Sequence, residues 1–232
     1  MNETQKTQLA HNIVAGLPGA NQNLSMDDIK NLLETYADID EAKLRNNLYT
    51  FLEEVIPTAE RLGIRMCCHP DDPPFSLLGL PRIMSTEADY TQMVDEVDSP
   101  ANGITLCSGS LGVGVENDLP GMMQRLGDKV HFLHLRNVAL DEQTTPCSFY
   151  ESEHLDGNTD MVALIASILD EEAKRKSAGR KDWNIPMRPD HGQDILDDLN
   201  REAQPGYPAI GRLKGLAELR GVSTALSKIR ER

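Results

Sequence analysis

The run Val130-His131-Phe132-Leu133-His134-Leu135 has the length and apolar content of a buried β-strand. Three other segments are similar short runs, at residues 64–69, 103–107 and 185–190. The last is the weakest strand prediction, because its two prolines cannot donate hydrogen bonds to a sheet. Together the four segments predict four strands.

Helical stretches lie between and before these segments. Those between them fall near residues 87–97, 118–126 and 160–177. Residues 1–62 are also expected to be helical, with a capping box from Ser25 to Asp28 and a later helix that ends near Gly63. Strands that alternate with helices predict an α/β fold with a parallel sheet. Because no repeat, low-complexity run or linker interrupts the chain, a single domain over residues 1–232 is expected.

The composition excludes several classes of function. The chain has 232 residues, 39% hydrophobic and 26% charged, as in a folded globular protein. Its net charge of −14 and lack of a basic stripe argue against nucleic acid or an anionic membrane as partner. A small anionic substrate is compatible with this charge if a metal ion or arginines make the electrostatic potential positive at the binding site. No apolar run reaches about 18 residues and no signal peptide is evident, so a cytoplasmic location without a membrane span is expected. The four cysteines show no disulfide pattern and are expected to be free thiols.

Each predicted strand ends in a side chain that can bind a metal ion. These residues are His69, Cys107, His134 and Asp190. Because the carboxyl ends of parallel strands share one edge of the sheet, the four side chains are expected to converge. Two imidazoles, a thiolate and a carboxylate suit Zn²⁺, Fe²⁺ or Mn²⁺ with positions left open for a substrate. A catalytic metal centre is the leading hypothesis, and a structural zinc site or no metal at all are the alternatives. His131 is expected to face away from His134 on a regular strand and to be no ligand.

The loops after these strands carry further reactive groups. Arg136 lies two residues beyond His134, where it could clamp a carboxylate, although a surface ion pair would explain it equally well. His191 directly follows Asp190 and is a natural general acid or base. Tyr207 lies in a rigid Pro-Gly-Tyr-Pro turn, where a packing role is the simpler explanation for the residue by itself.

Five segments together resemble the mannonate dehydratases. They are NIVAGLPGA at 12–20, HPDDPP at 69–74, LGLPRI at 78–83, MRPDHG at 187–192 and IGRLKGLAELRG at 210–221. The resemblance extends from about residue 9 to the C-terminus. It implies a fold similar to the xylose-isomerase-like barrels. It also implies dehydration of D-mannonate to 2-dehydro-3-deoxy-D-gluconate in hexuronate (glucuronate) breakdown, with Mn²⁺ or Fe²⁺ as cofactor.

The resemblance further implies roles for individual residues. The family's metal ligands fall on the same four strand-end residues, and its acid and base fall on His191 and Tyr207. Arg136 and Arg188 are the candidates for holding the carboxylate of the substrate. A divalent cation on the substrate's oxygens would lower the cost of removing the proton beside that carboxylate.

The chain departs from the family in its number of strands. A (β/α)8 barrel has eight strands in typically about 250 residues, whereas the strands predicted here all follow residue 63. The expected architecture is a partial (β/α)8 TIM barrel: the last four β/α units, at 63–232, preceded by helices at 1–62. An open half-barrel is expected to form a homo-oligomer or to need a complementary N-terminal half. The alternatives are an inactive remnant that binds metal without turnover, and a sugar isomerase of the same barrel superfamily.

Overall fold

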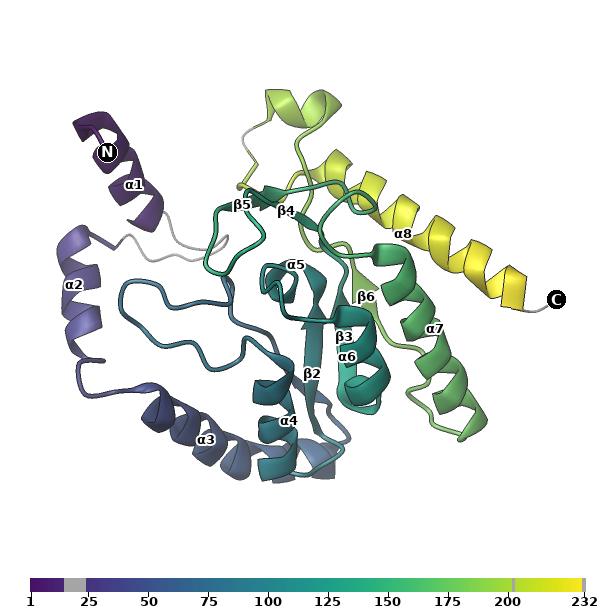
Figure 1. The fold of residues 1–232 in the computed structure, drawn as a ribbon. Coiled ribbons are helices and arrows are strands. Elements are labelled where there is room, and N and C mark those ends of the chain that lie inside the picture. Colours follow the sequence, from purple (N-terminus) through teal and green to yellow (C-terminus); the bar gives the residue numbers. More distant parts are fainter. Residues whose placement is uncertain (15–23, 202, 231–232) are drawn as a thin grey trace.

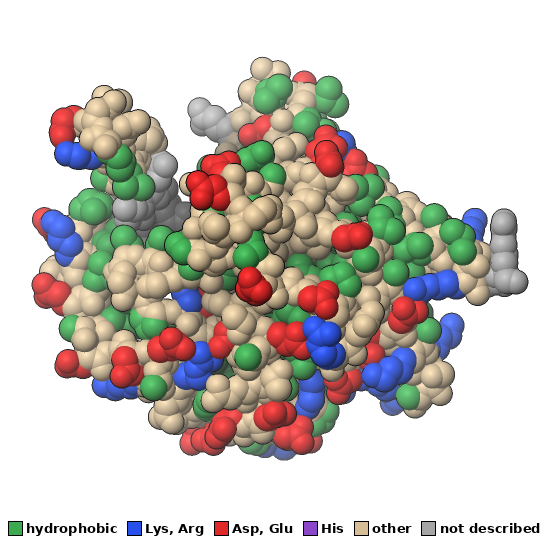
Figure 2. All heavy atoms as spheres, in the orientation of Figure 1, with side chains coloured by type: hydrophobic (Ala, Val, Ile, Leu, Met, Phe, Trp, Pro, Cys, Tyr) green, Lys and Arg blue, Asp and Glu red, His purple; other side chains and the backbone are tan. Residues whose placement is uncertain are grey.

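The structure, a computed structural model, describes residues 1–14, 24–201 and 203–230 (Figure 1). Residues 15–20 of the segment at 12–20 therefore lie outside the described part of the chain. Within the described part, no helix is long and apolar enough to cross a membrane. On the face drawn in Figure 2, the described basic side chains are interspersed with acidic ones and do not gather in one patch.

A parallel four-stranded sheet forms the centre of the chain and confirms the predicted α/β fold. Its order is β1-β2-β3-β6, and each neighbouring pair is parallel. The strands are β1 (Met66–Cys68), β2 (Asn102–Cys107), β3 (Val130–His134) and β6 (Met187–Arg188). β6 is only two residues long because Pro186 and Pro189 flank it and neither can donate to a neighbouring strand.

Helices pack on one face of the sheet and build the core with it. They include α3 (Glu41–Leu62), α4 (Glu87–Glu96), α6 (Leu119–Leu126) and α7 (Met161–Ser177). Ile104 and Leu106 of β2 join apolar side chains of these helices in one buried cluster. Since side chains alternate along a strand, Thr105 and Cys107 project from the opposite face. The face away from these helices therefore carries Thr105 and Cys107 of β2.

The predicted helices before the sheet are present in the described residues. α1 (Glu3–Val14) and α2 (Met26–Glu34) stand apart from the sheet in Figure 1. The capping box between Ser25 and Asp28 begins α2. α3 ends at Gly63, whose φ of 69° is the left-handed conformation that glycine adopts without strain. Both predicted helix boundaries are confirmed.

Asp160 caps α7, the helix that packs against α6 and α8 (Ala209–Arg230). Its side chain accepts a hydrogen bond from the backbone N–H of Ala163 at 2.9 Å, at the start of α7. We expect Asp160→Ala to lower the free energy of unfolding by about 1 kcal/mol, because a helical N–H loses its partner. Urea denaturation measures the difference. Asp156→Ala removes an exposed carboxylate of the preceding loop and should change the free energy of unfolding by less than half as much. Equal effects of the two substitutions would contradict the capping role.

Several elements were not predicted from the sequence. They are the hairpin strands β4 (Val138–Leu140) and β5 (Phe149–Glu151), the helices α5 (Ser108–Leu111) and α8 (Ala209–Arg230), and the 3₁₀ turns at Gly127–Lys129 and Leu196–Asn200. Strands of three residues are too short to show alternation of polar and apolar residues. Three glycines lower the helix propensity of α8. Its first turn is instead stabilised by the buried Asp198, which accepts hydrogen bonds from the N–H groups of Ile210 and Gly211.

The expected opposition of His131 and His134 is wrong because β3 is not a regular strand. The register between β2 and β3 shifts between Ile104 and Thr105, which inserts an extra residue into the pairing. The ring of His131 lies directly over Gly103, on the strand face that also carries Cys107. His131 nevertheless lies near the opposite end of the sheet, and among the described residues it is not in the group of His69, Cys107 and His134 that could hold a metal ion.

Candidate metal centre

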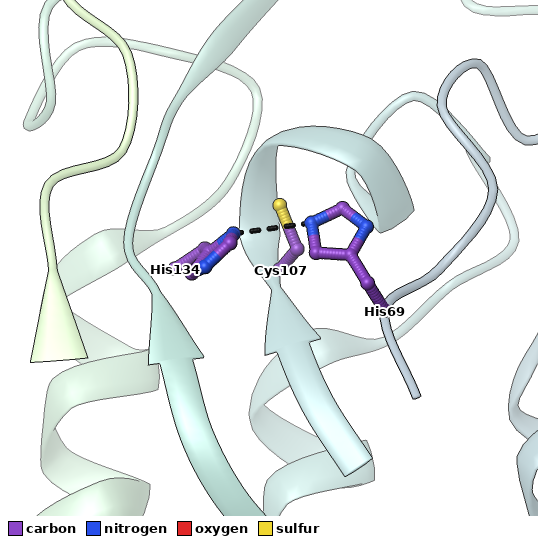
Figure 3. A group of neighbouring side chains, drawn as sticks. All are labelled: His69, Cys107 and His134. Carbon is purple, nitrogen blue, oxygen red and sulfur yellow. Dashed lines mark hydrogen bonds between the residues drawn. The ribbon is translucent and has the colours of Figure 1, made fainter. Parts of the chain in front are cut away.

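Four side chains that can bind a metal ion lie at the carboxyl edge of the parallel sheet. His69 is the first residue after β1, and Asp190 lies two residues beyond β6. Cys107 and His134 are the last residues of β2 and β3 and pair in register. In Figure 3 the thiol of Cys107 and the imidazoles of His69 and His134 point toward one another. The strand ends thus bring together residues that lie far apart in the sequence.

The donor atoms of these side chains form a compact group. Nε2 of His69 lies 3.1 Å from Nδ1 of His134. One ligand atom from each of His69, Cys107 and His134 lies within 4.8 Å of the others. Oδ2 of Asp190 lies 3.6 Å from Nδ1 of His134 and 3.9 Å from Sγ of Cys107. His69 is exposed and the other three are buried, so the group can be reached from the side of His69.

This donor set fits a divalent transition metal. Ligand atoms about 2.0–2.3 Å from a tetrahedral ion lie roughly 3.3–3.8 Å apart, close to the spacing found here. Burial lowers the pKa of His134 to about 4, so its imidazole is neutral and offers a lone pair. Burial raises the pKa of the Cys107 thiol to about 12, so a bound cation must displace its proton. A thiolate and a carboxylate would then balance the two charges of the ion.

Asp190 is held in an unusual conformation by its neighbours. Its φ is 63°, in the left-handed region that aspartate tolerates better than most residues. Nη2 of Arg188 donates to Oδ1 of Asp190 at 2.6 Å, which leaves Oδ2 turned toward the ligand group. The buried His154 contacts the carbonyl oxygen of Pro189 through Nε2 at 2.9 Å. These contacts fix the backbone and the carboxylate of Asp190. No motif in the sequence marks His154 for this role.

His191 and Tyr207 lie together beside the ligand group. Their ring centroids are 4.6 Å apart. Nε2 of His191 is 4.0 Å from Oδ2 of Asp190, and its Nδ1 is 2.7 Å from Oε1 of Glu151. Burial and the charge of Asp190 raise the pKa of Tyr207, so its hydroxyl is protonated near neutral pH. The guanidinium of Arg212 lies 5.3 Å from the centre of the Tyr207 ring. The structure therefore brings a titratable imidazole and a phenol to one point.

Arg136 is buried in a network of ion pairs. Its guanidinium donates to both carboxylate oxygens of Glu151, at 2.6 and 2.9 Å, and to Oδ2 of Asp72 at 2.7 Å. Its side chain packs over Gly109, where a Cβ atom would overlap it. Only 5% of the Arg136 side chain is exposed, against 41% for Arg188. Whether either arginine holds a substrate carboxylate stays a prediction. Glu151, which sequence reasoning missed, lies at the end of a three-residue strand that no motif marks.

Comparisons with known proteins match the whole chain to one family. A family model described as D-mannonate dehydratase (UxuA) matches residues 1–232. The chain is 60% identical over 227 residues to a mannonate dehydratase of Rhizobium meliloti (strain 1021), and the match covers 98% of this chain and 56% of that protein. The chain therefore spans little more than half the length of this relative.

Solved structures agree with these matches. A mannonate dehydratase from Streptococcus suis serotype 2 superimposes with a TM-score of 0.77 at 32% identity, over 94% of this chain and 58% of that chain. A xylose isomerase-like TIM barrel protein from Mycobacterium smegmatis gives a TM-score of 0.52 at 15% identity, over 81% of this chain and 53% of that one. The second likeness concerns the fold alone.

Proposed function

Because this chain belongs to the D-mannonate dehydratase (UxuA) family, we propose that it carries the metal centre of a hydro-lyase that converts D-mannonate to 2-dehydro-3-deoxy-D-gluconate and water. This step belongs to hexuronate (glucuronate) breakdown. One observation carries the proposal: four donor groups from successive strand ends converge beside an imidazole and a phenol. A structural metal site alone would not need an acid–base pair at its edge.

His69, Cys107, His134 and Asp190 are the proposed ligands of a Mn²⁺ or Fe²⁺ ion. The sulfur ligand argues against Ca²⁺, which prefers oxygen. A bound divalent ion would stabilise negative charge on the oxygens of the substrate. Reduced thiols persist in the cytoplasm, and the need for a free Cys107 supports a cytoplasmic location as part of the proposal.

His191 and Tyr207 are the proposed acid–base pair. One group takes the proton from C2 of the sugar acid, and the other donates a proton to the C3 hydroxyl, so that the C3–O bond breaks and water leaves. Groups 4.6 Å apart between ring centres can serve adjacent carbons of one substrate. Arg188 is the better placed candidate for holding the substrate's carboxylate, because the donors of Arg136 already pair with Glu151 and Asp72.

We further propose that residues 63–232 supply the last four β/α units of a (β/α)8 barrel, with residues 1–62 as a helical lead within one domain. Within the described residues, β1 pairs only with β2 and β6 only with β3, which leaves both edges of the sheet open. The chain also spans 56% and 58% of two longer relatives. Open strand edges favour pairing with another chain. The proposed partner is a second copy or a complementary N-terminal half.

A direct assay tests this function. The purified chain is loaded with Mn²⁺ and given D-mannonate, first alone and then with the remaining N-terminal part of a longer relative. We expect keto-deoxy acid to form in at least the second mixture, at a rate proportional to the amount of this chain. Absence of product in both mixtures would overturn the proposed activity and leave an inactive metal-binding remnant.

A further inference from the structure

Glu151 connects the acid–base pair to a buried ionic network. Its Oε1 contacts Nδ1 of His191 at 2.7 Å and accepts a hydrogen bond from Nη2 of Arg136 at 2.6 Å. Its Oε2 accepts from Nε of Arg136 at 2.9 Å. Nη1 of the same guanidinium donates to Asp72, in the loop after β1. Glu151 thus connects the segments that follow β3 and β6 directly, and the loop after β1 through Arg136.

The charge of Glu151 bears on which nitrogen of His191 carries a proton, because the carboxylate contacts Nδ1 of that ring. Burial by itself would raise the pKa of Glu151, but its contacts with His191 and with the Arg136 guanidinium, which donates to both carboxylate oxygens, outweigh burial and lower that pKa. The carboxylate is therefore ionised at neutral pH and can only accept hydrogen bonds. The 2.7 Å contact between Nδ1 of His191 and Oε1 of Glu151 needs one proton, and an ionised carboxylate has none. Nδ1 of His191 must then be the donor.

We propose that Glu151 is a positioning residue, which keeps the proton of His191 on Nδ1 and leaves Nε2 to exchange a proton with the substrate. Nε2 is the nitrogen that faces the ligand group, 4.0 Å from Oδ2 of Asp190. The inference rests on the proposed function, because it assigns an orientation to the acid or base of that reaction. Glu151 acts only through His191 and is itself occupied by its three hydrogen-bond donors.

Arg136 has a definite part in this arrangement. Its two parallel hydrogen bonds fix both oxygens of Glu151 in one plane, and its pairing with Asp72 fixes the guanidinium in turn. The side chain lies in the space that Gly109 leaves open. The Arg136 guanidinium is therefore assigned to holding Glu151, which leaves the substrate's carboxylate to another group.

Glu151→Gln tests the inference without a change in side-chain size. An amide has one acceptor oxygen and one NH₂ group, so it must turn its NH₂ toward either His191 or Arg136. The ¹⁵N resonances of the His191 ring, assigned by their loss in His191→Gln, report the proton position in the metal-free chain. We expect Nδ1 to be protonated in the wild type and the proton to move in part to Nε2 in Glu151→Gln. A neutral wild-type ring protonated at Nε2, or identical spectra for the two proteins, would overturn the inference.

Turnover provides a second readout. We expect Glu151→Gln to lower kcat by about 10- to 100-fold, the usual effect of losing a group that orients a functional side chain, while KM and Mn²⁺ affinity change less than about threefold. Glu151→Asp, which keeps the charge, should recover part of kcat. Glu142→Gln makes the same chemical change at an exposed position in the loop of the same hairpin and should match the wild type. Equal kcat for Glu151→Gln and the wild type would contradict the role.

The two proposals fail in different ways. If the wild-type chain forms no product with or without the N-terminal part, the proposed function fails, and the ring spectra still decide the position of the His191 proton. If the wild type is active but Glu151→Gln changes neither spectrum nor kcat, the inference alone fails.

Discussion

Replacing His69 with alanine is expected to abolish stoichiometric binding of Mn²⁺. His69 supplies one of four convergent donors, and its Nε2 is 3.1 Å from the donor nitrogen of His134. Loss of an outer partner of a ligand already costs about 10- to 100-fold in affinity, so loss of a ligand should cost more. The side chain is exposed, and its removal should leave the unfolding temperature nearly unchanged. Titration followed by the electron paramagnetic resonance signal of free Mn²⁺ measures the binding.

Asp190→Asn extends this prediction to the carboxylate. Asparagine tolerates the φ of 63° as aspartate does, whereas alanine would add backbone strain to the loss of a ligand. We expect Mn²⁺ affinity to fall sharply in Asp190→Asn and to stay at the wild-type value in Asp194→Asn, an exposed aspartate four residues along the chain. His131→Ala, which removes an imidazole outside the ligand group, should also keep full affinity. Unchanged binding in both His69→Ala and Asp190→Asn would show the ligand assignment to be wrong.

The convergence of these strand-end side chains could be predicted from the sequence because the rule behind it is local. A short apolar run identifies a strand, and the residue at its carboxyl end lies at the shared edge of a parallel sheet. His69, Cys107 and His134 follow directly from this rule, and they meet as expected. Asp190 follows from the same rule, but at the end of the weakest predicted strand, because β6 has only two residues and proline on either side. The family resemblance points to the same residue.

The groups that orient the site could not be predicted in the same way. Glu151 lies 40 residues from His191, on a hairpin whose strands are too short to show a pattern. His154 contacts the carbonyl of Pro189, and a backbone acceptor leaves no trace in the sequence. The position of His131 depends on a β-bulge, which shifts the alternation that a regular strand would have. Such contacts arise from the packing of distant loops, so a single sequence does not reveal them.

Removing either member of the proposed acid–base pair is expected to lower kcat by about 10²- to 10⁴-fold while Mn²⁺ binding is retained. His191→Gln removes the imidazole beside Asp190. Tyr207→Phe removes the hydroxyl from a ring whose centroid lies 4.6 Å from that of His191. Tyr150→Phe is the matched control for the second change, because Tyr150 is 59% exposed on the hairpin. Equal kcat for Tyr207→Phe and Tyr150→Phe would contradict an acid–base role for Tyr207. Metal binding by each variant separates loss of chemistry from loss of the site.

Exchange of the C2 hydrogen assigns the two roles. In ²H₂O, a variant that lacks the acid can still remove the C2 proton and return a deuteron, because the C3–O bond does not break. A variant that lacks the base can neither remove the C2 proton nor return a deuteron. We therefore expect one of His191→Gln and Tyr207→Phe to incorporate deuterium at C2 of D-mannonate much faster than it forms product, and the other to leave the substrate unlabelled. Proton NMR of the recovered D-mannonate measures the label. Full dehydration by both variants would remove both residues from the reaction, and the proton transfers would then require other groups at the same edge of the sheet.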